Sequence, residues 1–340
     1  MTSSLGEAVE RPVLVAPDSF KGTFRAAQVA GAIGRGLERA GLMPPDLMPL
    51  ADGGDGTLDA MLVNLGGETV SARVKDPLGR EFEAGYGLVE EGGTALVEMA
   101  AASGLSLVAE DERDAWAAST YGTGQLIADA VARGAQVILV AVGGSATTDG
   151  GAGALEAIED AGGLKGAKIV VLSDVQVPWE RCAEVFGPQK GADQAMVERL
   201  TQRLDELAST FPKDPRGVPM TGAAGGLSGG LWAVHGATLE PGAPWILDAL
   251  GFDERMRAAR AVVTGEGKLD EQTLQGKLVG EIGTRTRQAG VPLHAIVGTD
   301  ALDAFGKRMI DLQVVTAATT LEEIESAGED LGRRLASGDA

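Results

Sequence analysis

Several residue types that mark common classes of protein are scarce in this sequence of 340 residues. It has a single cysteine, Cys182, which excludes an internal disulfide and gives no sign of an oxidising compartment. Its two histidines, His235 and His294, have no partner at the spacing of metal ligands, so we expect both to be structural. Aromatic residues make up only 4%, so the core must consist mainly of Ala, Val, Leu and Ile. No apolar run approaches the ~18 residues of a membrane span, and no membrane partner is expected.

Positive charge is scarce as well. The sequence has 29 basic and 49 acidic residues, which gives a formal net charge of −20. A surface this negative repels nucleic acids, so no nucleic-acid partner is expected. It repels anionic substrates too, and a site for one must therefore gather cations, helix N-termini or Mg²⁺ locally. Solubility is the simplest account of the acidic surface itself.

The first residues of the chain, 1–11, are polar and acidic, and we expect them to be a flexible N-terminus. They lack the basic-then-apolar order of a signal peptide. The expected location is therefore the cytoplasm.

Glycine is abundant, with 50 residues and no collagen-like period. Between the glycines, short β-branched runs alternate with Ala-rich stretches of helical period. Strands are expected at 13–16, 47–50, 137–142, 169–172, 261–264, 293–297 and 312–315, and helices at 26–37, 57–65, 124–133, 196–208, 278–289 and 321–335. The first helix contains Gly31, Gly34 and Gly36, each of which weakens a helix by up to ~1 kcal/mol relative to Ala, so packing must hold it.

This alternation predicts an α/β fold. Continuous apolar strands separated by helices indicate a parallel sheet of Rossmann or flavodoxin-like type, covered on both faces. Residues 68–99 differ, because shorter strands with partial alternation flank a turn at Pro77 and Gly79. We expect a discontinuous parallel-sheet domain, 12–66 plus 255–340, with a second mixed α/β domain, 67–254, inserted into it and a cleft between the two.

The loops after the expected strands carry the residues of a candidate site. In open α/β sheets, ligands bind beyond the carboxyl ends of the strands. These loops mix glycine with acids, hydroxyls or a lysine, and we expect them on one edge: 18–22, 52–56, 143–151, the loop at Asp174, 265–270 and 298–300. Phosphoryl transfer uses these residue types, since backbone N–H groups and lysine bind phosphate, carboxylates hold Mg²⁺ and one carboxylate accepts the hydroxyl proton.

Each loop alone is more simply explained as a connector, because Gly-Gly and Asp-Gly pairs are common in turns. Asp149 is as well explained as the cap of the following helix as by a role in binding. No loop matches the Walker A pattern or a G-x-G-x-x-G motif that opens a helix after the first strand. The sequence therefore gives no support to a P-loop or a Rossmann dinucleotide site.

In these loops and in several further segments, the sequence resembles the bacterial type I glycerate kinases. The matching segments occur in the family's order: 16–22 (APDSFKG), 51–57 (ADGGDGT), 98–105, 120–124, 143–147, 185–192, 222–227 and 264–270 (TGEGKLD). The resemblance extends from about Val13 to the final helix. It implies a two-domain kinase that takes MgATP as donor and D-glycerate as acceptor, with 2-phosphoglycerate as the favoured product, acting as a monomer or homodimer.

The resemblance also implies roles for individual residues. Lys21 is expected to bind phosphate or carboxylate, and one acid among Asp18, Asp52 and Asp270 to bind Mg²⁺ or accept the proton. The expected catalytic residues are Asp18, Lys21, Asp52 and Asp270, the expected metal ligands are Asp52, Glu266 and Asp270, and the expected substrate- or nucleotide-binding residues are Ser19, Gly53, Gly54, Gly143, Gly144, Ser145, Asp149, Lys190, Gly265 and Glu266.

The sequence departs from the family pattern in places. Where the family commonly reads CDVDNPL, residues 173–179 read SDVQVPW, so Gln176 and Val177 replace an acid and an amide. Residues 154–168 look shortened, Thr148 stands for the usual Asn, and Val279 for a common Pro. Two other functions stay open for this reason: a non-catalytic or regulatory binder that kept the fold, and a kinase for another small hydroxy acid.

Overall fold

The computed structural model describes residues 11–20 and 22–338. Lys21 and most of the expected flexible N-terminus, 1–10, lie outside the described residues, as do 339–340. The chain divides into two compact units. Unit 1 consists of the described residues up to Ala51 and those from Leu247 onward, and unit 2 is Asp52–Ile246.

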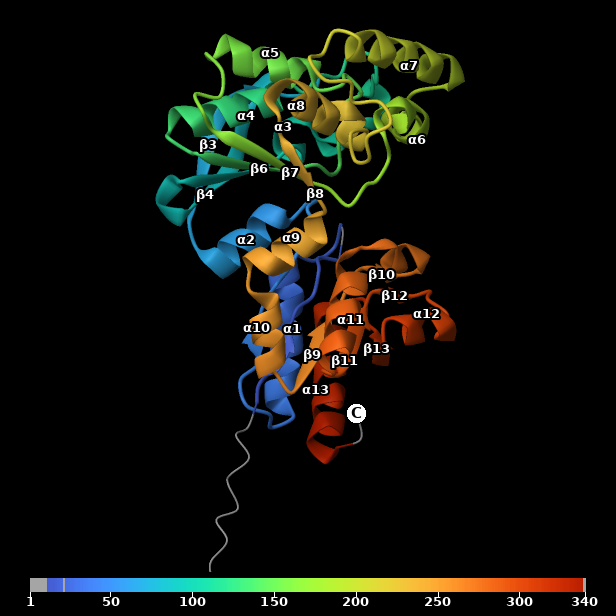
Figure 1. The fold of residues 1–340 in the computed structure, drawn as a ribbon. Helices are drawn as coiled ribbons and strands as arrows, with labels where there is room; N and C mark the ends of the chain where they lie inside the picture. The colour runs from blue at the N-terminus through green and yellow to red at the C-terminus, as the bar shows by residue number, and fades with distance from the viewer. Residues whose placement is uncertain (1–10, 21, 339–340) are drawn as a thin grey trace, which may run out of the picture. The chain divides into compact units, whose positions relative to one another are not determined.

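Unit 1 contains a parallel sheet of five strands in the order β13-β11-β9-β1-β2. Strands β9, β11 and β13 of this sheet are labelled in Figure 1. The strands are β1 (Val13–Val15), β2 (Asp46–Leu47), β9 (Ala261–Thr264), β11 (Leu293–Val297) and β13 (Leu312–Ala317). A separate pair of short parallel strands, β10 (Lys268–Leu269) and β12 (Thr299–Asp300), extends the loops beyond β9 and β11. Every residue of β1, β9 and β11 is buried, as expected of strands covered on both faces.

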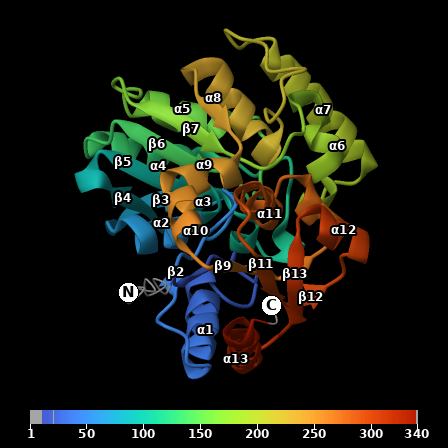
Figure 2. The same cartoon turned by 60° about the horizontal axis from the view of Figure 1, so that its bottom comes forward.

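Helices cover the sheet of unit 1. They are α1 (Ala26–Arg39), α10 (Phe252–Ala258), α11 (Leu278–Ala289), α12 (Ala304–Met309) and α13 (Leu321–Ser337), with a 3₁₀ turn, η7 (Glu271–Gln275). Side by side, α1 and α13 pack on the face to which Val13, Val15 and Val263 point (Figure 2). At their crossing a Cβ on Gly36 would lie 2.1 Å from the backbone oxygen of Glu325, so this glycine permits the close approach that holds α1.

Unit 2 contains a mixed sheet of six strands in the order β3-β4-β5-β6-β7-β8. The strands are β3 (Glu68–Lys75), β4 (Glu81–Val89), β5 (Thr94–Glu98), β6 (Val137–Ala141), β7 (Lys168–Leu172) and β8 (Thr238–Glu240). The first three pair antiparallel, through the expected turn between β3 and β4, and β5 to β8 pair parallel.

Unit 2 contains more of the described helices than unit 1 does. They are α2 (Thr57–Leu65), α3 (Ala100–Ser103), α4 (Tyr121–Ala132), α5 (Ala152–Asp160), α6 (Cys182–Phe186), α7 (Gln194–Ala208) and α8 (Leu227–His235), with α9 (Gly242–Ala249) crossing the boundary between the units. Short 3₁₀ turns are η1 (Glu90–Gly92), η2 (Leu105–Leu107), η3 (Glu110–Glu112), η4 (Trp179–Arg181), η5 (Pro188–Lys190) and η6 (Ala223–Gly226). Helices α4, α5 and α8 pack on the sheet in one apolar cluster, and α2 packs on β4 and β5.

The fold class expected from the sequence is confirmed: a parallel-sheet α/β part and a second, mixed α/β part. The expected domain limits lay after residue 66 and before residue 255, whereas the compact units meet at 51/52 and 246/247. The packing of α2 on strands β4 and β5 accounts for the first difference.

The expectation that all the candidate loops share one sheet edge is wrong. Strand β6 pairs with β5 and β7 pairs with β6, not with β1 or β9, so within the described residues the two larger sheets are separate and have two carboxyl edges. Apolar runs of similar length give no information on which strands share a sheet. Among the described residues, no helix is both long enough and apolar enough to span a membrane.

Candidate active site

In unit 1, the carboxyl ends of β1 and β9 hold Asp18, Ser19 and Gly265 together. The N–H of Asp18 donates to the oxygen of Gly265 over 2.8 Å, and the N–H of Ser19 donates to Oδ1 of Asp18 over 2.6 Å. Below them, Oγ1 of Thr264 donates to the oxygen of Ala16 over 2.9 Å. Asp18 is buried, with 6% of its surface exposed. Two loops that are far apart in the sequence thus form one rigid layer at this edge.

The loop that follows β9 carries Glu266 and Asp270. Nζ of Lys268 lies 2.9 Å from Oδ2 of Asp270, and this contact, with the N–H of Gln272 at 2.9 Å, holds the pKa of Asp270 below its usual value. Oε1 of Glu266 accepts the hydroxyl of Thr273 over 2.7 Å. The ionised form of Asp270 is therefore favoured, as a cation ligand requires.

In unit 2, the loop Asp52–Gly56 is folded on itself. Oδ1 of Asp52 accepts the N–H of Gly54 over 3.0 Å, and Oγ1 of Thr57 donates to the oxygen of Gly54 over 2.7 Å. A Cβ on Gly143 would lie 2.9 Å from Cα of Gly54, so the loop after β6 touches this one backbone to backbone. The structure therefore brings Asp52, Gly53, Gly54 and Gly143 together, with Gly54 and Gly143 partly exposed.

Glu98, at the end of β5, is a residue that the sequence did not single out as functional. Its Oε1 accepts the N–H of Leu58 over 2.9 Å, and it also accepts the N–H of Gly56, at the first turn of α2. Burial raises the pKa of this carboxyl to about 7, against the effect of those hydrogen bonds, and Asp55 raises it further. Its only signal in the sequence was its place at the start of the matching segment 98–105.

Ser145 and Gly144 are held against the 99–105 segment. The oxygen of Gly144 accepts the N–H of Leu105 over 2.8 Å, and the N–H of Ala146 donates to the oxygen of Ser103 over 2.9 Å. Ser145 forms an isolated bridge with Gly104 and has 9% of its surface exposed. This segment continues the edge formed by the Asp52 and Gly143 loops.

Asp149, from the same loop, is almost completely buried. Its Oδ2 accepts the N–H and Oγ1 of Thr120, both over 2.8 Å, and the N–H of Gly153 over 3.2 Å, while Oδ1 accepts the N–H of Gly151 over 3.1 Å. These contacts join the first turns of α4 and α5. They favour the capping role, which the sequence left open, over a role in ligand binding.

Lys190 is also turned inward, with 1% of its surface exposed. Its Nζ donates to the backbone oxygen of Thr147, and burial lowers its pKa to about 8. In this conformation its ammonium group supports the loop that contains Thr147 and does not face solvent.

The segment 173–179, which departs from the family pattern, is well packed. The side chain of Trp179 is buried, with Nε1 donating to the oxygen of Leu204 over 3.0 Å and its ring edge-on to Phe211 at 5.8 Å. The oxygen of Val177 accepts the N–H of Gly222 over 2.9 Å. Gln176 is exposed. Trp179 thus anchors the end of this segment, while the substituted Gln176 faces outward.

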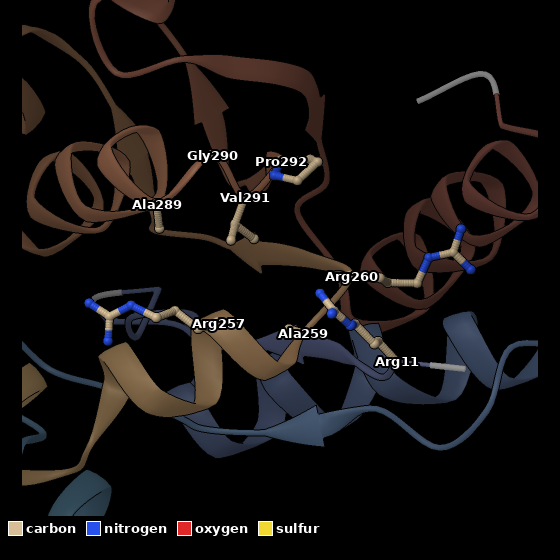
Figure 3. A pocket seen from close by; sticks show the side chains of 8 residues that line it. All are labelled: Arg11, Arg257, Ala259, Arg260, Ala289, Gly290, Val291 and Pro292. Carbon is tan, nitrogen blue, oxygen red and sulfur yellow. The ribbon is translucent and has the colours of Figure 1, made fainter. Parts of the chain in front are cut away.

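A cavity of about 430 Å³ in unit 1 lies at the opposite, amino end of the strands (Figure 3). Arg11, Arg257 and Arg260 line it, next to the ends of α10 and α11. Nη2 of Arg260 donates to the oxygen of Leu335, near the end of α13, over 2.7 Å. Because helix C-termini carry partial negative charge, Arg260 is explained as a partner of the end of α13, and Arg257 pairs with Asp253 of its own helix over 3.2 Å. The cavity is not a candidate active site.

Metal binding was expected at Asp52, Glu266 and Asp270. Asp52 belongs to unit 2 and the other two to unit 1, and within the described part of the chain no three acids, histidines or cysteines form a ready-made metal group. Mg²⁺ commonly uses only one or two carboxylates and completes its shell with water and substrate phosphates. The paired acids Glu266 and Asp270 fit that mode.

Buried acids and glycine-rich turns at the carboxyl ends of parallel strands define the chain as an α/β protein with phosphotransferase-like loops. The model of the glycerate kinase family matches residues 13–162 and 159–336. A glycerate kinase of Halalkalibacterium halodurans is 37% identical, and a glycerate 2-kinase of Escherichia coli K12 is 36% identical, over 94% and 92% of each chain.

A crystal structure from Salmonella typhimurium LT2, provisionally described as glycerate kinase 2, superimposes with a TM-score of 0.84. It is 32% identical and covers 96% of this chain and 99% of its own. The chain belongs to the glycerate kinase family, which confirms the resemblance seen in the sequence, and it is an enzyme of the kinase class.

Proposed function

We propose that this enzyme transfers the γ-phosphoryl group of ATP to D-glycerate. The observation that carries the proposal is the identity of 37% with a glycerate kinase over 94% of both chains. The acid- and glycine-bearing loops at the two carboxyl edges supply groups suited to this chemistry.

Mg²⁺, held by Glu266, Asp270 or Asp52, would neutralise the charge that develops on the phosphates. The substrate hydroxyl oxygen forms a bond to the γ-phosphorus, while the bond from that phosphorus to the bridging oxygen of ADP breaks. The hydroxyl proton passes to a carboxylate, for which Asp18, Asp52 and Asp270 are the candidates. Backbone N–H groups of Gly53, Gly143 and Gly144, with Ser19 and Ser145, bind the anionic groups of the ligands, while the N–H of Gly54 donates to Asp52 and shapes the loop.

Lys21 is assigned to phosphate or carboxylate binding from the sequence. For Asp149 and Lys190, which the sequence assigned to ligand binding, the inward contacts support a role in holding the 143–151 loop in place.

The 2-hydroxyl is the proposed acceptor, because one relative is a glycerate 2-kinase that is 36% identical over 92% of each chain. Phosphorus NMR of the product made from D-glycerate tests this point. We expect the signal of 2-phosphoglycerate, and a product phosphorylated only at the 3-hydroxyl would refute the assignment.

The experiment for the function itself is ADP formation by the purified protein with MgATP and D-glycerate. We expect turnover well above the rate without glycerate, and no turnover without Mg²⁺. A rate equal to background in the presence of folded protein would favour a non-catalytic binder.

A kinase for another small hydroxy acid is the second candidate, favoured by Gln176 and Val177, which stand where the family commonly has an acid and an amide. A panel of hydroxy acids assayed at equal concentration separates the two. A higher kcat/KM for another member of the panel than for D-glycerate would establish the second candidate.

A further inference from the structure

Thr273 lies between the two acids of the loop that follows β9. It belongs to the η7 turn, and its side chain is completely buried. Its hydroxyl donates to Oε1 of Glu266 over 2.7 Å and accepts the N–H of Asp270 over 3.2 Å. One neutral hydroxyl therefore connects the two residues to which we assign Mg²⁺.

The turn itself explains only one of these contacts. Asp270 caps η7 by accepting the N–H of Gln272, and Thr273 completes a capping box by accepting the N–H of Asp270. The contact with Glu266 is outside this box. A hydroxyl has one proton to donate, and this one is directed at a carboxylate.

Thr273 is itself rigidly held. A Cβ on Gly280, near the start of α11, would lie 2.2 Å from the backbone oxygen of Thr273, so η7 and α11 pack directly on each other. A donor fixed in this way restricts the rotation of the carboxylate that it contacts. Groups that orient metal-binding carboxylates in this manner strengthen metal binding and preserve the geometry of the reaction.

The two acids have different supports. Lys268 holds Asp270 by an ion pair of 2.9 Å, whereas a buried neutral hydroxyl contacts Glu266. The hydroxyl of Thr273 donates to the carboxylate of Glu266 without adding a charge, and this hydrogen bond fixes the direction of Oε1.

We propose that Thr273 is a positioning residue. Its hydroxyl holds the Glu266 carboxylate in the orientation that binds Mg²⁺, or that binds the anionic substrate by way of Mg²⁺. The proposal rests on the proposed function. Thr273 is too deeply buried to contact the substrate, so it acts through the acids that it contacts, and the proposed route is the hydrogen bond to Glu266.

The test compares Thr273→Val, which keeps the shape and removes the hydroxyl, with Thr273→Ser, which keeps the hydroxyl. The control is Thr286→Val. Thr286 is an equally buried threonine of unit 1, and its hydroxyl donates to the oxygen of Ile282 within α11. Melting temperature, kcat and the Mg²⁺ concentration for half-maximal rate are measured for each, with MgATP and D-glycerate.

We expect Thr273→Val to lower kcat or raise the Mg²⁺ requirement about tenfold or more, and Thr273→Ser to restore most of the loss. Thr286→Val is expected to change the melting temperature only. Equal kinetics of Thr273→Val, Thr273→Ser and the unmodified enzyme would overturn the proposal.

Glu266→Gln separates this proposal from the proposed function. If Glu266→Gln abolishes turnover while Thr273→Val does not, the function stands and the positioning role fails. If the unmodified enzyme forms no ADP, the function fails first. The Thr273→Val/Glu266→Gln double variant should be no slower than Glu266→Gln alone, because Thr273 acts through that residue. A further tenfold loss in the double variant would contradict this route.

Discussion

His294 is a fully buried imidazole in β11, and neither of its ring nitrogens has a hydrogen-bond partner within the described part of the chain. Burial lowers its pKa from 6.5 to about 4, so the folded protein holds it neutral. The sequence placed it inside an apolar strand, and its structural role follows from that position. For Lys190 the sequence gave no such guide, because nothing in its position indicated that its ammonium group is buried.

His294→Leu should reduce the fall in the free energy of unfolding at acid pH. Below pH 6.5 the imidazole of the unfolded chain is protonated, whereas the imidazole of the folded chain stays neutral down to about pH 4. The contribution of His294 to stability is therefore fully present above pH 6.5 and is lost as the pH falls from 6.5 to about 4. The loss amounts to about 3 kcal/mol. Urea unfolding at pH 7.5 and pH 4.5 should show a smaller difference for His294→Leu than for the unmodified protein. The same pH dependence in both would contradict the burial of a neutral imidazole.

At the scale of the element, the first helix shows how packing compensates for poor intrinsic propensity. Three of its residues are glycines, yet α1 runs for 14 residues because it lies against α13. Gly36 permits this contact, whereas Gly31 has only the flexible end of Arg35 near the place of a Cβ.

These two glycines form a matched pair for mutation. Gly36→Ala should destabilise the protein by roughly 2 kcal/mol or more, because the new methyl group meets the backbone of α13. Gly31→Ala should stabilise it by roughly 0.5–1 kcal/mol, because alanine favours the helix and has room. Denaturant unfolding of both variants checks the prediction. Equal changes in the free energy of unfolding would show that helix propensity, and not contact with α13, sets the effect of each substitution.

The carboxyl group of Glu98, at the end of β5, accepts N–H groups from the start of α2, and its burial makes ionisation costly. The folded pKa of Glu98, about 7, lies above its unfolded value of 4.5, so its contribution to stability is fully present below pH 4.5 and is lost as the pH rises through 7. Glu98→Gln keeps an acceptor for the N–H of Leu58 without the charge.

We therefore expect Glu98→Gln to be more stable than the unmodified protein at pH 8, by up to about 3 kcal/mol, and to match it near pH 4.5. Melting curves across this range, without added metal, make the comparison. A variant that is less stable at pH 8 would mean that the carboxylate is ionised and needed at the start of α2.

At the scale of the whole molecule, the sequence predicted those elements whose pattern is local. Helices 57–65 and 278–289 and strands 261–264 and 293–297 have the expected ends, because hydrophobic period and flanking glycines define them. Helix α8 was missed, since its Gly229 and Gly230 suppress any helical pattern. The reason for Gly229 is tertiary: a Cβ there would lie 2.5 Å from the ring of Trp179.

The same distinction applies to the candidate site. Motif spacing located the acid-bearing loops, and the structure places Asp18 with Gly265, and Asp52 with Gly54 and Gly143. Motif spacing did not reveal that the loops belong to two sheets, since strand pairing is a long-range property. Glu98 and Thr273 were missed as supports of the site, because their contacts cross between segments that lie apart in the sequence or depend on side-chain direction.

The central claim is that the acids of these loops perform phosphoryl transfer to D-glycerate. The most direct measurement is ADP release with MgATP and D-glycerate by the unmodified protein and by Asp270→Asn, together with their melting temperatures. We predict turnover by the unmodified protein and at least a tenfold lower kcat for Asp270→Asn, with a nearly unchanged melting temperature. Undiminished turnover by Asp270→Asn, or no turnover by the folded, unmodified protein, would contradict the account.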